Sequence, residues 1–298
     1  MFDRLFAEYL VDTGKLTKEQ LERVYLDQQK KYVRLGVIAV SEKLMTVEEV
    51  EEVNQLQALY DKRFGDIAVS EGYLSEEQVN RLLTLQGNPF LTFMQAVIDS
   101  DIISAGDFDE LLRKYQRANN FTLMNIEEMK TCQVDRIVPI FMYKEPELVQ
   151  KLCGVMIRTL SRLIDNHVYI RHPYHEQSVD FDALAMQELN GDHHILTSIA
   201  GDANEAMMKV AVAFAGAENV SDSDDSLDAI CELINCVNGL LATEVSNREV
   251  DIDMAAPLSY SNKGQVKGED VLVLPFVACG YEFKMIVTYD KDYEIGEV

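Results

Sequence analysis

The sequence predicts an α+β protein with two domains, a helical repeat followed by a sandwich of helices and strands. One observation is a period of 29 residues that runs without gaps through residues 1–118, which is typical of stacked helical hairpins. The other is a change of pattern after Pro146, where helical and extended apolar runs are mixed and two strand-like runs close the chain, as in an α+β fold. With 298 residues the chain is long enough for two domains that each bury a core.

The four repeat units begin at Leu5, Arg34, Arg63 and Thr92. Each unit predicts a short apolar helix, a tight turn and a second, amphipathic helix. Gly14 and Gly72 stand in two of the turns, where a left-handed backbone is expected. On these features alone the region is an all-helical scaffold of four hairpins.

The second helix of each unit opens with a hydroxyl residue, and an amide or carboxyl residue follows three positions later. This is the spacing of a capping box, in which the two side chains satisfy backbone N–H groups reciprocally. We expect the shorter Asp to form the weakest box. The four pairs are Thr17 with Gln20, Thr46 with Glu49, Ser75 with Gln78 and Ser104 with Asp107.

The two middle units begin Arg34-Leu35-Gly36 and Arg63-Phe64-Gly65, and they end in glutamine. They resemble the MshEN-type domain, whose tandem motifs start Arg-Leu-Gly, end in Gln and bind cyclic di-GMP. Lys43 stands where that motif has an internal glycine, Asn54 occupies an apolar position, and Phe64 replaces Leu. The alternative is a scaffold that binds no nucleotide.

The resemblance implies a role for each residue type at these positions. An arginine can stack on a base and pair with a phosphate, a glutamine can bind a base edge, and a glycine lets the ligand approach the backbone. The implied cyclic di-GMP contacts are Arg34, Gly36, Gln57, Arg63, Gly65 and Gln86.

The repeat stops between Arg117 and Pro146, where two asparagines and two prolines interrupt it. We therefore expect residues 119–145 to link a helical domain of residues 1–118 to a second domain of residues 146–298.

The second domain mixes both kinds of element. Helical spacing predicts helices over 147–164, 203–216 and 226–246. Extended runs at 167–174 and 193–201 are separated by a polar region. The last two strands, 270–280 and 281–290, predict a hairpin that turns at Gly280.

The helix expected over 226–246 carries two stripes at alternating spacings of three and four residues. The apolar stripe, which we expect to be buried, is Leu227, Ile230, Ile234, Val237, Leu241 and Val245. The other stripe, expected to face outward, is Asp228, Glu232, Asn235, Gly239, Ala242 and Ser246. A glycine inside a helix costs about 1 kcal/mol relative to alanine, so Gly239 suggests close approach of another group. Taken alone, the Glu232–Asn235 pair is a very common pattern that indicates an ordinary solvated helix face.

The string from Glu232 to Gly239, followed by an extended segment that ends in Pro257, resembles the CheX/CheC/FliY family of chemotaxis phosphatases. The order of helices and strands from Pro146 to Tyr289 matches as well. Leu240 stands where the family often has asparagine. The helix at 147–164 lacks the Glu-x-x-Asn pair, so one active helix is expected, as in the CheX branch.

The resemblance implies a CheX-like α/β sandwich that removes the phosphoryl group from the aspartate of a CheY-like response regulator. Glu232 would dock a cationic group of that partner, and Asn235 would orient the attacking water. Phosphoryl transfer depends mainly on positioning, for which a neutral amide is suited. Mg²⁺ is expected on the partner rather than on this chain, and the family often forms homodimers. The alternative is a cyclic-di-GMP-binding adaptor whose CheX-like domain is catalytically silent.

The composition limits the other classes of function. A net charge of -24 disfavours binding to nucleic acid or to an anionic membrane.

The five cysteines are odd in number and form no Cys-x-x-Cys pair, which fits reduced thiols and a cytoplasmic location. We expect no metal site, because no cysteine lies at ligand spacing from the histidines. We also expect neither a signal peptide nor a membrane span. The histidines are His167, His172, His175, His193 and His194.

Overall fold

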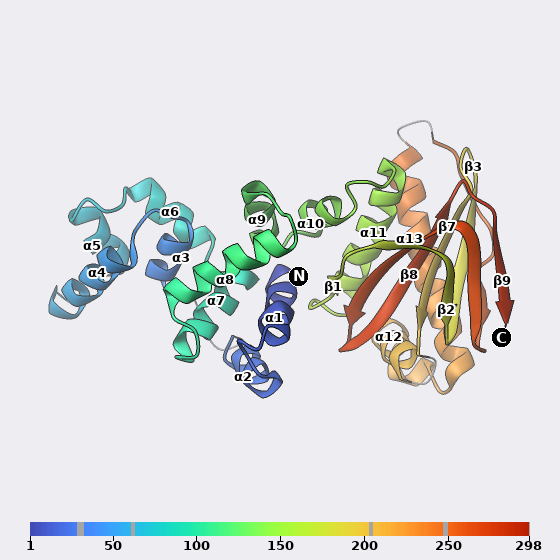
Figure 1. Cartoon of the computed structure of the whole chain (residues 1–298), viewed down its shortest axis with the longest axis horizontal. Helices are drawn as coiled ribbons and strands as arrows, with labels where there is room; N and C mark the ends of the chain where they lie inside the picture. The colour runs from blue at the N-terminus through green and yellow to red at the C-terminus, as the bar shows by residue number, and fades with distance from the viewer. Residues whose placement is uncertain (29–32, 61–62, 203–204, 247–249, 298) are drawn as a thin grey trace. The chain divides into compact units, whose positions relative to one another are not determined.

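The computed structural model describes residues 1–28, 33–60, 63–202, 205–246 and 250–297. The chain divides into two compact units, Phe2–Gln133 and Val134–Val298. The first unit is helical, and the second carries the sheet (Figure 1).

The N-terminal unit consists of paired helices followed by α9. Its helices are α1 (Phe2–Asp12), α2 (Lys18–Gln28), α3 (Leu35–Ser41), α4 (Val47–Tyr60), α5 (Phe64–Ser70), α6 (Glu76–Thr84), α7 (Pro89–Asp99), α8 (Ala105–Ala118) and α9 (Leu123–Lys130). The second helix of each pair starts 29 residues after the last, at Lys18, Val47, Glu76 and Ala105. The first helices differ, because α3 and α5 have 7 residues and α1 and α7 have 11. The pairs are thus not four equivalent units, and the four-unit repeat stays a prediction.

The capping boxes form as their spacing predicts. The backbone N–H of Thr17 donates to Gln20 Oε1 at 2.8 Å, and that of Gln20 donates to Thr17 Oγ1 at 3.1 Å. Equivalent pairs of bonds form at Thr46 and at Ser75. In the fourth pair the Asp107 carboxylate accepts from the Ser104 hydroxyl and not from its backbone. The shorter side chain closes only half of the box.

Four turns share one left-handed residue at the same place in the period. Gly14 and Gly72 have φ of +66° and +79°, as expected. Lys43 and Asp101, at the corresponding positions, have φ of +56° although neither is glycine. The turn is therefore imposed by the two helices that it joins, and glycine only lowers its cost.

The segment expected to link the domains contains α9 and α10 (Val134–Phe141), and the boundary between the units falls after Gln133. Thr122 and Asn125 form a further capping box that starts α9. Pro139, which predicts a break, lies inside α10.

In the C-terminal unit, helices flank a curled sheet (Figure 1). Its further helices are α11 (Glu147–Leu163), α12 (Ala206–Ala215), the short 3₁₀ helix η1 (Ala217–Asn219) and α13 (Ser223–Ser246). Its strands are β1 (Tyr169–Ile170), β2 (Tyr174–Phe181), β3 (Ala183–Gly191), β4 (Ile195–Gly201), β5 (Ile252–Met254), β6 (Leu258–Tyr260), β7 (Gly264–Ala278), β8 (Tyr281–Tyr289) and β9 (Tyr293–Glu297).

The sheet has the order β1-β7-β8-β4-β3-β5, and every described pairing is antiparallel. Besides this path, β2 and β9 pair with the long strand β7, and β6 pairs with β3. The predicted hairpin is confirmed: β7 and β8 are joined at Cys279 and Gly280, whose φ values of +52° and +82° fit a tight two-residue turn.

The polar region between the first two predicted strands, for which the sequence predicts no element, forms most of β2 and all of β3. Leu184 and Met186 of β3 lie in a core cluster with residues of β2, β4, β7 and β8. Side chains alternate along a strand, so Gln187 points to the opposite face, which α13 covers. The strand that the sequence missed is thus the one on which α13 packs.

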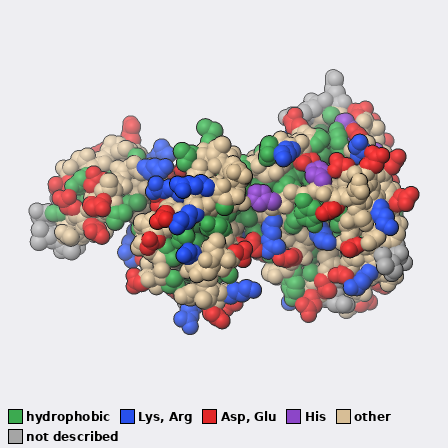
Figure 2. All heavy atoms as spheres, viewed as in Figure 1, with side chains coloured by type: hydrophobic (Ala, Val, Ile, Leu, Met, Phe, Trp, Pro, Cys, Tyr) green, Lys and Arg blue, Asp and Glu red, His purple; other side chains and the backbone are tan. Residues whose placement is uncertain are grey.

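Acidic side chains are scattered over the C-terminal unit on the face shown in Figure 2, with basic side chains among them. The surplus of acids in the sequence is therefore spread on this face and does not form one patch. Among the described residues, none of the helices combines the length and apolar character that crossing a membrane requires.

His175 on β2 lies between two carboxylates, with Nδ1 2.6 Å from Asp270 and Nε2 2.9 Å from Glu145. Burial lowers the pKa of His175, but hydrogen bonds and charge from Glu145 and Asp270 outweigh it, so the pKa is raised. A raised folded-state pKa contributes stability that is complete below the unfolded pKa of about 6.5 and is lost as the pH rises through the folded value.

We therefore predict that His175→Gln lowers the free energy of unfolding at pH 5.5 but has little effect at pH 9. The loss should be below about 1 kcal/mol, because the imidazole is partly solvated. Denaturant unfolding across this pH range measures the difference. Glu145→Gln should reduce the same pH dependence, and an equal loss for His175→Gln at both pH values would contradict the assignment.

Candidate functional site

The candidate site is on α13, whose first turn is fixed by the acidic segment before it. Asp222 Oδ1 accepts hydrogen bonds from the backbone N–H groups of Asp224 and Asp225, both at 3.0 Å. Asp225 in turn accepts from the N–H and hydroxyl of Ser221, and these bonds lower the pKa of its carboxyl group. The acids cap the helix, where the macrodipole favours negative charge.

The apolar stripe predicted for this helix is buried over its whole length. The exposed fractions of its six side chains lie between 0% and 2%. The helix α13 packs against α11, α12, β3, β4, β5 and β6. On the other stripe, Asp228, Glu232 and Ser246 are exposed, and Asn235, Gly239 and Ala242 are partly exposed. The rotation of α13 about its axis therefore turns Glu232 and Asn235 outward.

Glu232 is exposed one turn before Asn235. Within the part of the chain that the structure describes, no hydrogen bond or ion pair engages its carboxylate. This carboxylate can therefore bind a cation or hydrogen-bond donor of another molecule without first breaking an internal contact.

Asn235 is half-buried, and a side chain of the underlying strand β3 holds its carboxamide. Its Oδ1 accepts a hydrogen bond of 2.9 Å from Nε2 of Gln187 on β3. The described residues provide no acceptor for its Nδ2. The side chain is thus neither enclosed in the interior nor free to rotate.

Gln187 joins three segments of the unit. Its Nε2 also donates to the carbonyl of Ala255, at 2.8 Å, in the segment between β5 and β6. Its Oε1 accepts from Nδ2 of Asn238 on α13, also at 2.8 Å. Gln187 is 1% exposed and Asn238 is 0% exposed. The sequence pattern predicts neither residue as part of the site, because neither belongs to the outward stripe.

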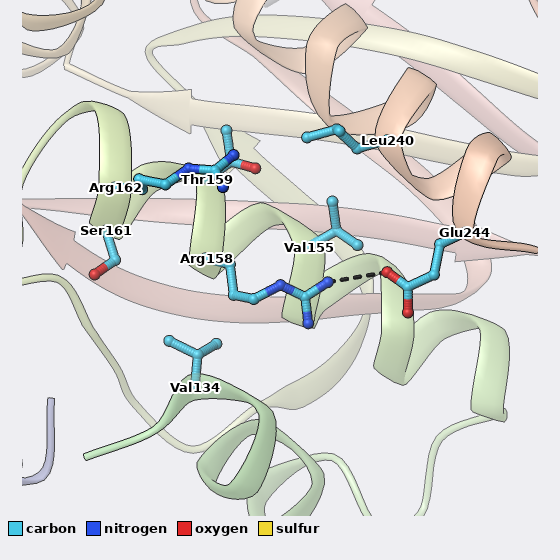
Figure 3. Close-up of a pocket in the computed structure, with 8 residues that line it drawn as sticks. All are labelled: Val134, Val155, Arg158, Thr159, Ser161, Arg162, Leu240 and Glu244. Carbon is cyan, nitrogen blue, oxygen red and sulfur yellow. Dashed lines mark hydrogen bonds and ion pairs between the residues drawn. The ribbon is translucent and has the colours of Figure 1, made fainter.

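A pocket of about 350 Å³ lies along another side of α13 and is lined by residues of α10, α11 and α13 (Figure 3). Arg158 of α11 crosses it to Glu244, at 2.9 Å, and also pairs with Asp135 of α10. Leu240, five residues after Asn235, is 44% exposed at its edge. At 3.6 residues per turn, Leu240 and Glu244 point away from the Asn235 stripe, so this pocket is separate from the candidate site.

Gly239 lies one turn after Asn235, and a Cβ atom added there would meet no described atom within 4 Å apart from its chain neighbours and the backbone of its own helix. Packing within the described chain therefore does not require glycine at this position. Its lack of a side chain leaves room for another molecule beside Asn235.

Two cysteines flank the pair on α13. Burial, with a contribution from nearby Asp228, raises the pKa of the Cys231 thiol to about 11, so this thiol is protonated and unreactive at neutral pH. Cys236 is exposed, and all five cysteines are free. Within the described ranges, no group of three or more His, Cys, Asp or Glu residues is arranged to hold a metal ion.

Three of the predicted nucleotide contacts, Gly36, Gly65 and Gln86, make packing or hydrogen-bond contacts within the N-terminal unit itself. Gly36 and Gly65 are buried where α3 and α5 pack on the following helices, and a Cβ would come within 2.6 Å of Val50 and 2.9 Å of Val79. Close helix packing thus accounts for both glycines without a ligand. The Gln86 amide donates to the Val33 carbonyl at 2.9 Å, beside the start of the first motif.

The other predicted contacts differ in exposure. Arg34 and Arg63 are exposed N-cap residues of α3 and α5, and Arg34 lies 3.3 Å from Asp99. Gln57 is partly exposed on α4. The structure describes no contact that brings all six residues together.

Part of the C-terminal unit matches the model of a known protein family. Residues 183–277 match the model described as chemotaxis phosphatase CheX. This range contains β3 and the whole of α13, with Gln187, Glu232 and Asn235. The C-terminal unit therefore contains a CheX-type domain. No curated protein matches the chain.

Several solved structures are similar to about half of the chain. A CheX from Desulfovibrio desulfuricans is 17% identical over 48% of this chain and 99% of its own, with a TM-score of 0.43. A putative chemotaxis protein from Desulfovibrio vulgaris Hildenborough is 14% identical over 49% and 97%, with a TM-score of 0.42. The CheX–CheY–BeF3–Mg²⁺ complex from Borrelia burgdorferi is 15% identical over 48% and 97%, with a TM-score of 0.40.

These identities and TM-scores are low, so the functional argument rests on the family match and the geometry of α13. None of the matches supports the resemblance of the N-terminal unit to the MshEN-type domain. Binding of cyclic di-GMP stays a prediction.

The position of Gly239 predicts opposite effects on folding and on function. Gly239→Ala should raise the free energy of unfolding by about 1 kcal/mol, because alanine favours the helix and its methyl group meets no described atom outside the backbone of α13. If another protein packs on this stripe, the added methyl group should weaken its binding. Denaturant unfolding and partner affinity measure the two effects. A less stable Gly239→Ala protein would show that the glycine is needed by this chain's own packing.

The MshEN resemblance predicts that titration with cyclic di-GMP gives measurable heat in calorimetry. Arg34→Ala and Arg63→Ala should weaken that binding, because an arginine both stacks and pairs with phosphate. Arg113→Ala, which removes an exposed arginine of α8 outside the motifs, is the matched control. If titration gives no heat, or if all variants bind with equal affinity, the hypothesis that Arg34 and Arg63 bind cyclic di-GMP is wrong.

Proposed function

We propose that the CheX-type domain of the C-terminal unit hydrolyses the aspartyl phosphate of a CheY-like response regulator. The observation that carries this proposal is the outward Glu232–Asn235 pair on a helix whose opposite face is buried. The family match supports the same class of reaction.

Asn235 supplies positioning rather than covalent chemistry. A water held by its carboxamide attacks phosphorus in line with the bond to the aspartate oxygen. The new P–O bond forms as the acyl phosphate P–O bond breaks, and the bonding electrons leave with the aspartate carboxylate. Both protons of the water end on the released dihydrogen phosphate. A water fixed at the attack distance needs less ordering at the moment of reaction.

A carboxamide suits this task in an acidic chain. A carboxylate at position 235 would repel the dianionic acyl phosphate, whereas an amide can donate or accept a hydrogen bond without adding charge. We expect Mg²⁺ on the partner to offset the negative charge that gathers in the transition state, so this chain needs no metal of its own.

Glu232 supplies docking. Its exposed carboxylate lies one turn from Asn235 on the same stripe and can pair with a cationic side chain of the response regulator. Gly239, one turn further on, leaves space for the partner's backbone or side chains. The three positions together form a surface that is charged at one end and open at the other.

The test is a phosphatase assay with phosphorylated CheY-type receivers. We predict that Asn235→Ala lowers kcat about 100-fold, the typical cost of removing one positioned hydrogen-bonding group from a transition state. Glu232→Ala should mainly raise KM, because Glu232 docks the partner without contacting the reacting atoms.

The matched control is Asn166→Ala, which removes an exposed asparagine outside α13 and should leave kcat unchanged. If Asn235→Ala hydrolyses the phosphoryl group as fast as the unmutated protein, the proposed function is wrong.

A further inference from the structure

We propose that Gln187 is the positioning residue of this site, which holds the Asn235 carboxamide with its Nδ2 directed outward. This inference rests on the proposed function for its kinetic consequence, but the orientation of the amide is a property of this chain alone. Gln187 lies on β3, 48 residues before Asn235.

The orientation follows from a fixed acceptor at the base of the network. A backbone carbonyl can only accept hydrogen bonds, so the Gln187 atom 2.8 Å from the Ala255 oxygen must be the amide nitrogen. Ala255 is itself held in place, because its N–H donates to the Glu188 carbonyl of β3 at 2.9 Å. The carbonyl that orients Gln187 is therefore tied to the same strand that carries Gln187.

Asn238 fixes the other end of the Gln187 amide. Its Nδ2 donates to Gln187 Oε1 at 2.8 Å, and this contact also requires oxygen at that end. Gln187 Nε2 thus uses its two protons on Ala255 and Asn235, while Oε1 is engaged by Asn238. The Gln187 amide has one orientation that satisfies all three contacts.

This orientation determines that of Asn235. The atom of Asn235 that lies 2.9 Å from Gln187 Nε2 must be its oxygen, because two NH₂ groups would otherwise face each other. Nδ2 therefore points to the partly exposed side. The donor end of the catalytic amide meets the partner, and an N–H that donates to one lone pair of the water leaves the other lone pair for attack on phosphorus.

Gln187 does not touch the reacting atoms in this arrangement, since it is 1% exposed beneath α13. Its effect passes through Asn235, which without it would turn freely about its last side-chain bond. Such a loss of orientation is expected in kcat and not in KM, because the amide acts in the transition state and the docking surface is intact.

Gln187→Glu is the sharpest test. A Glu side chain carries at most one donor proton, and the fixed acceptor at Ala255 takes it, so the oxygen that faces Asn235 can only accept. Asn235 should therefore turn its Nδ2 inward and present its oxygen to the partner. We expect kcat to fall at least tenfold with KM within a factor of two.

A double-mutant cycle separates positioning from a general structural defect. In an Asn235→Ala background, Gln187→Glu should lower kcat no further, because the group that it orients is gone. Thr288→Val is the matched control: Thr288 is 1% exposed on β8, and its hydroxyl has no hydrogen-bond partner in the structure. It should leave kcat unchanged. If Gln187→Glu does not fold, Gln187→Met keeps the side-chain length, removes the donor and should show the same loss of kcat.

Side-chain amide NMR tests the orientation without any partner. In the unmutated protein the Gln187 NH₂ should exchange slowly and the Asn235 NH₂ rapidly. In Gln187→Glu the Asn235 NH₂ should become protected. Slow exchange of the Asn235 NH₂ in the unmutated protein would overturn the orientation.

The kinetic measurements test the positioning role of Gln187, whereas the NMR measurement tests only the orientation of the Asn235 amide. Unchanged kcat in both Gln187 variants, or an equal loss in the presence and absence of Asn235, would overturn the positioning role. A complete lack of phosphatase activity in the unmutated protein would overturn the proposed function and the kinetic role with it, while amide exchange would still decide the orientation.

Discussion

The C-terminal unit depends on the burial of one face of α13 against β3, β4, α11 and α12. Each buried Leu, Ile or Val side chain contributes roughly 1.5–3 kcal/mol, so the six residues of the stripe together fix the rotation of the helix. A rotation of about 100°, one residue along the helix, would expose part of this stripe and press Glu232 or Asn235 toward the sheet. The orientation of the functional pair is therefore set by apolar contacts on the opposite side of the helix.

Polar contacts then set the finer orientation that apolar packing leaves undefined. Buried amides are costly unless they are hydrogen-bonded, and the described residues offer no partner to the buried Oδ1 of Asn238. An apolar side chain at position 238 would avoid this cost but could not hold Gln187. The buried amides thus define a single geometry at some expense in stability, which is typical of functional sites.

The sequence predicts what local periodicity determines. Hydrophobic spacing along α13 identified its buried and outward stripes, and the capping spacing located the starts of four helices. β2 and β3 escaped because β2 is mostly exposed and polar and β3 contains a buried Gln187. Gln187 contacts residues that lie 48, 51 and 68 positions away in the sequence. A periodic pattern within one helix or strand cannot predict contacts at such sequence separations. The helices between residues 119 and 145 were missed because Asn and Pro are poor helix formers that tertiary packing can override.

The geometry of α13 also reconciles a net charge of -24 with the proposed reaction at a phosphoryl group. Long-range repulsion between like charges is screened within about 10 Å at moderate salt, so only groups close to phosphorus determine the local cost. The structure puts a neutral amide at the outward position and keeps the nearest stripe acid, Glu232, one turn away. In the proposed complex, this separation lets the carboxylate attract a cationic group of the partner while the phosphoryl group meets an N–H donor. The proposed role of Gln187 completes this arrangement, because a carboxamide turned the other way would present an oxygen to the phosphoryl oxygens.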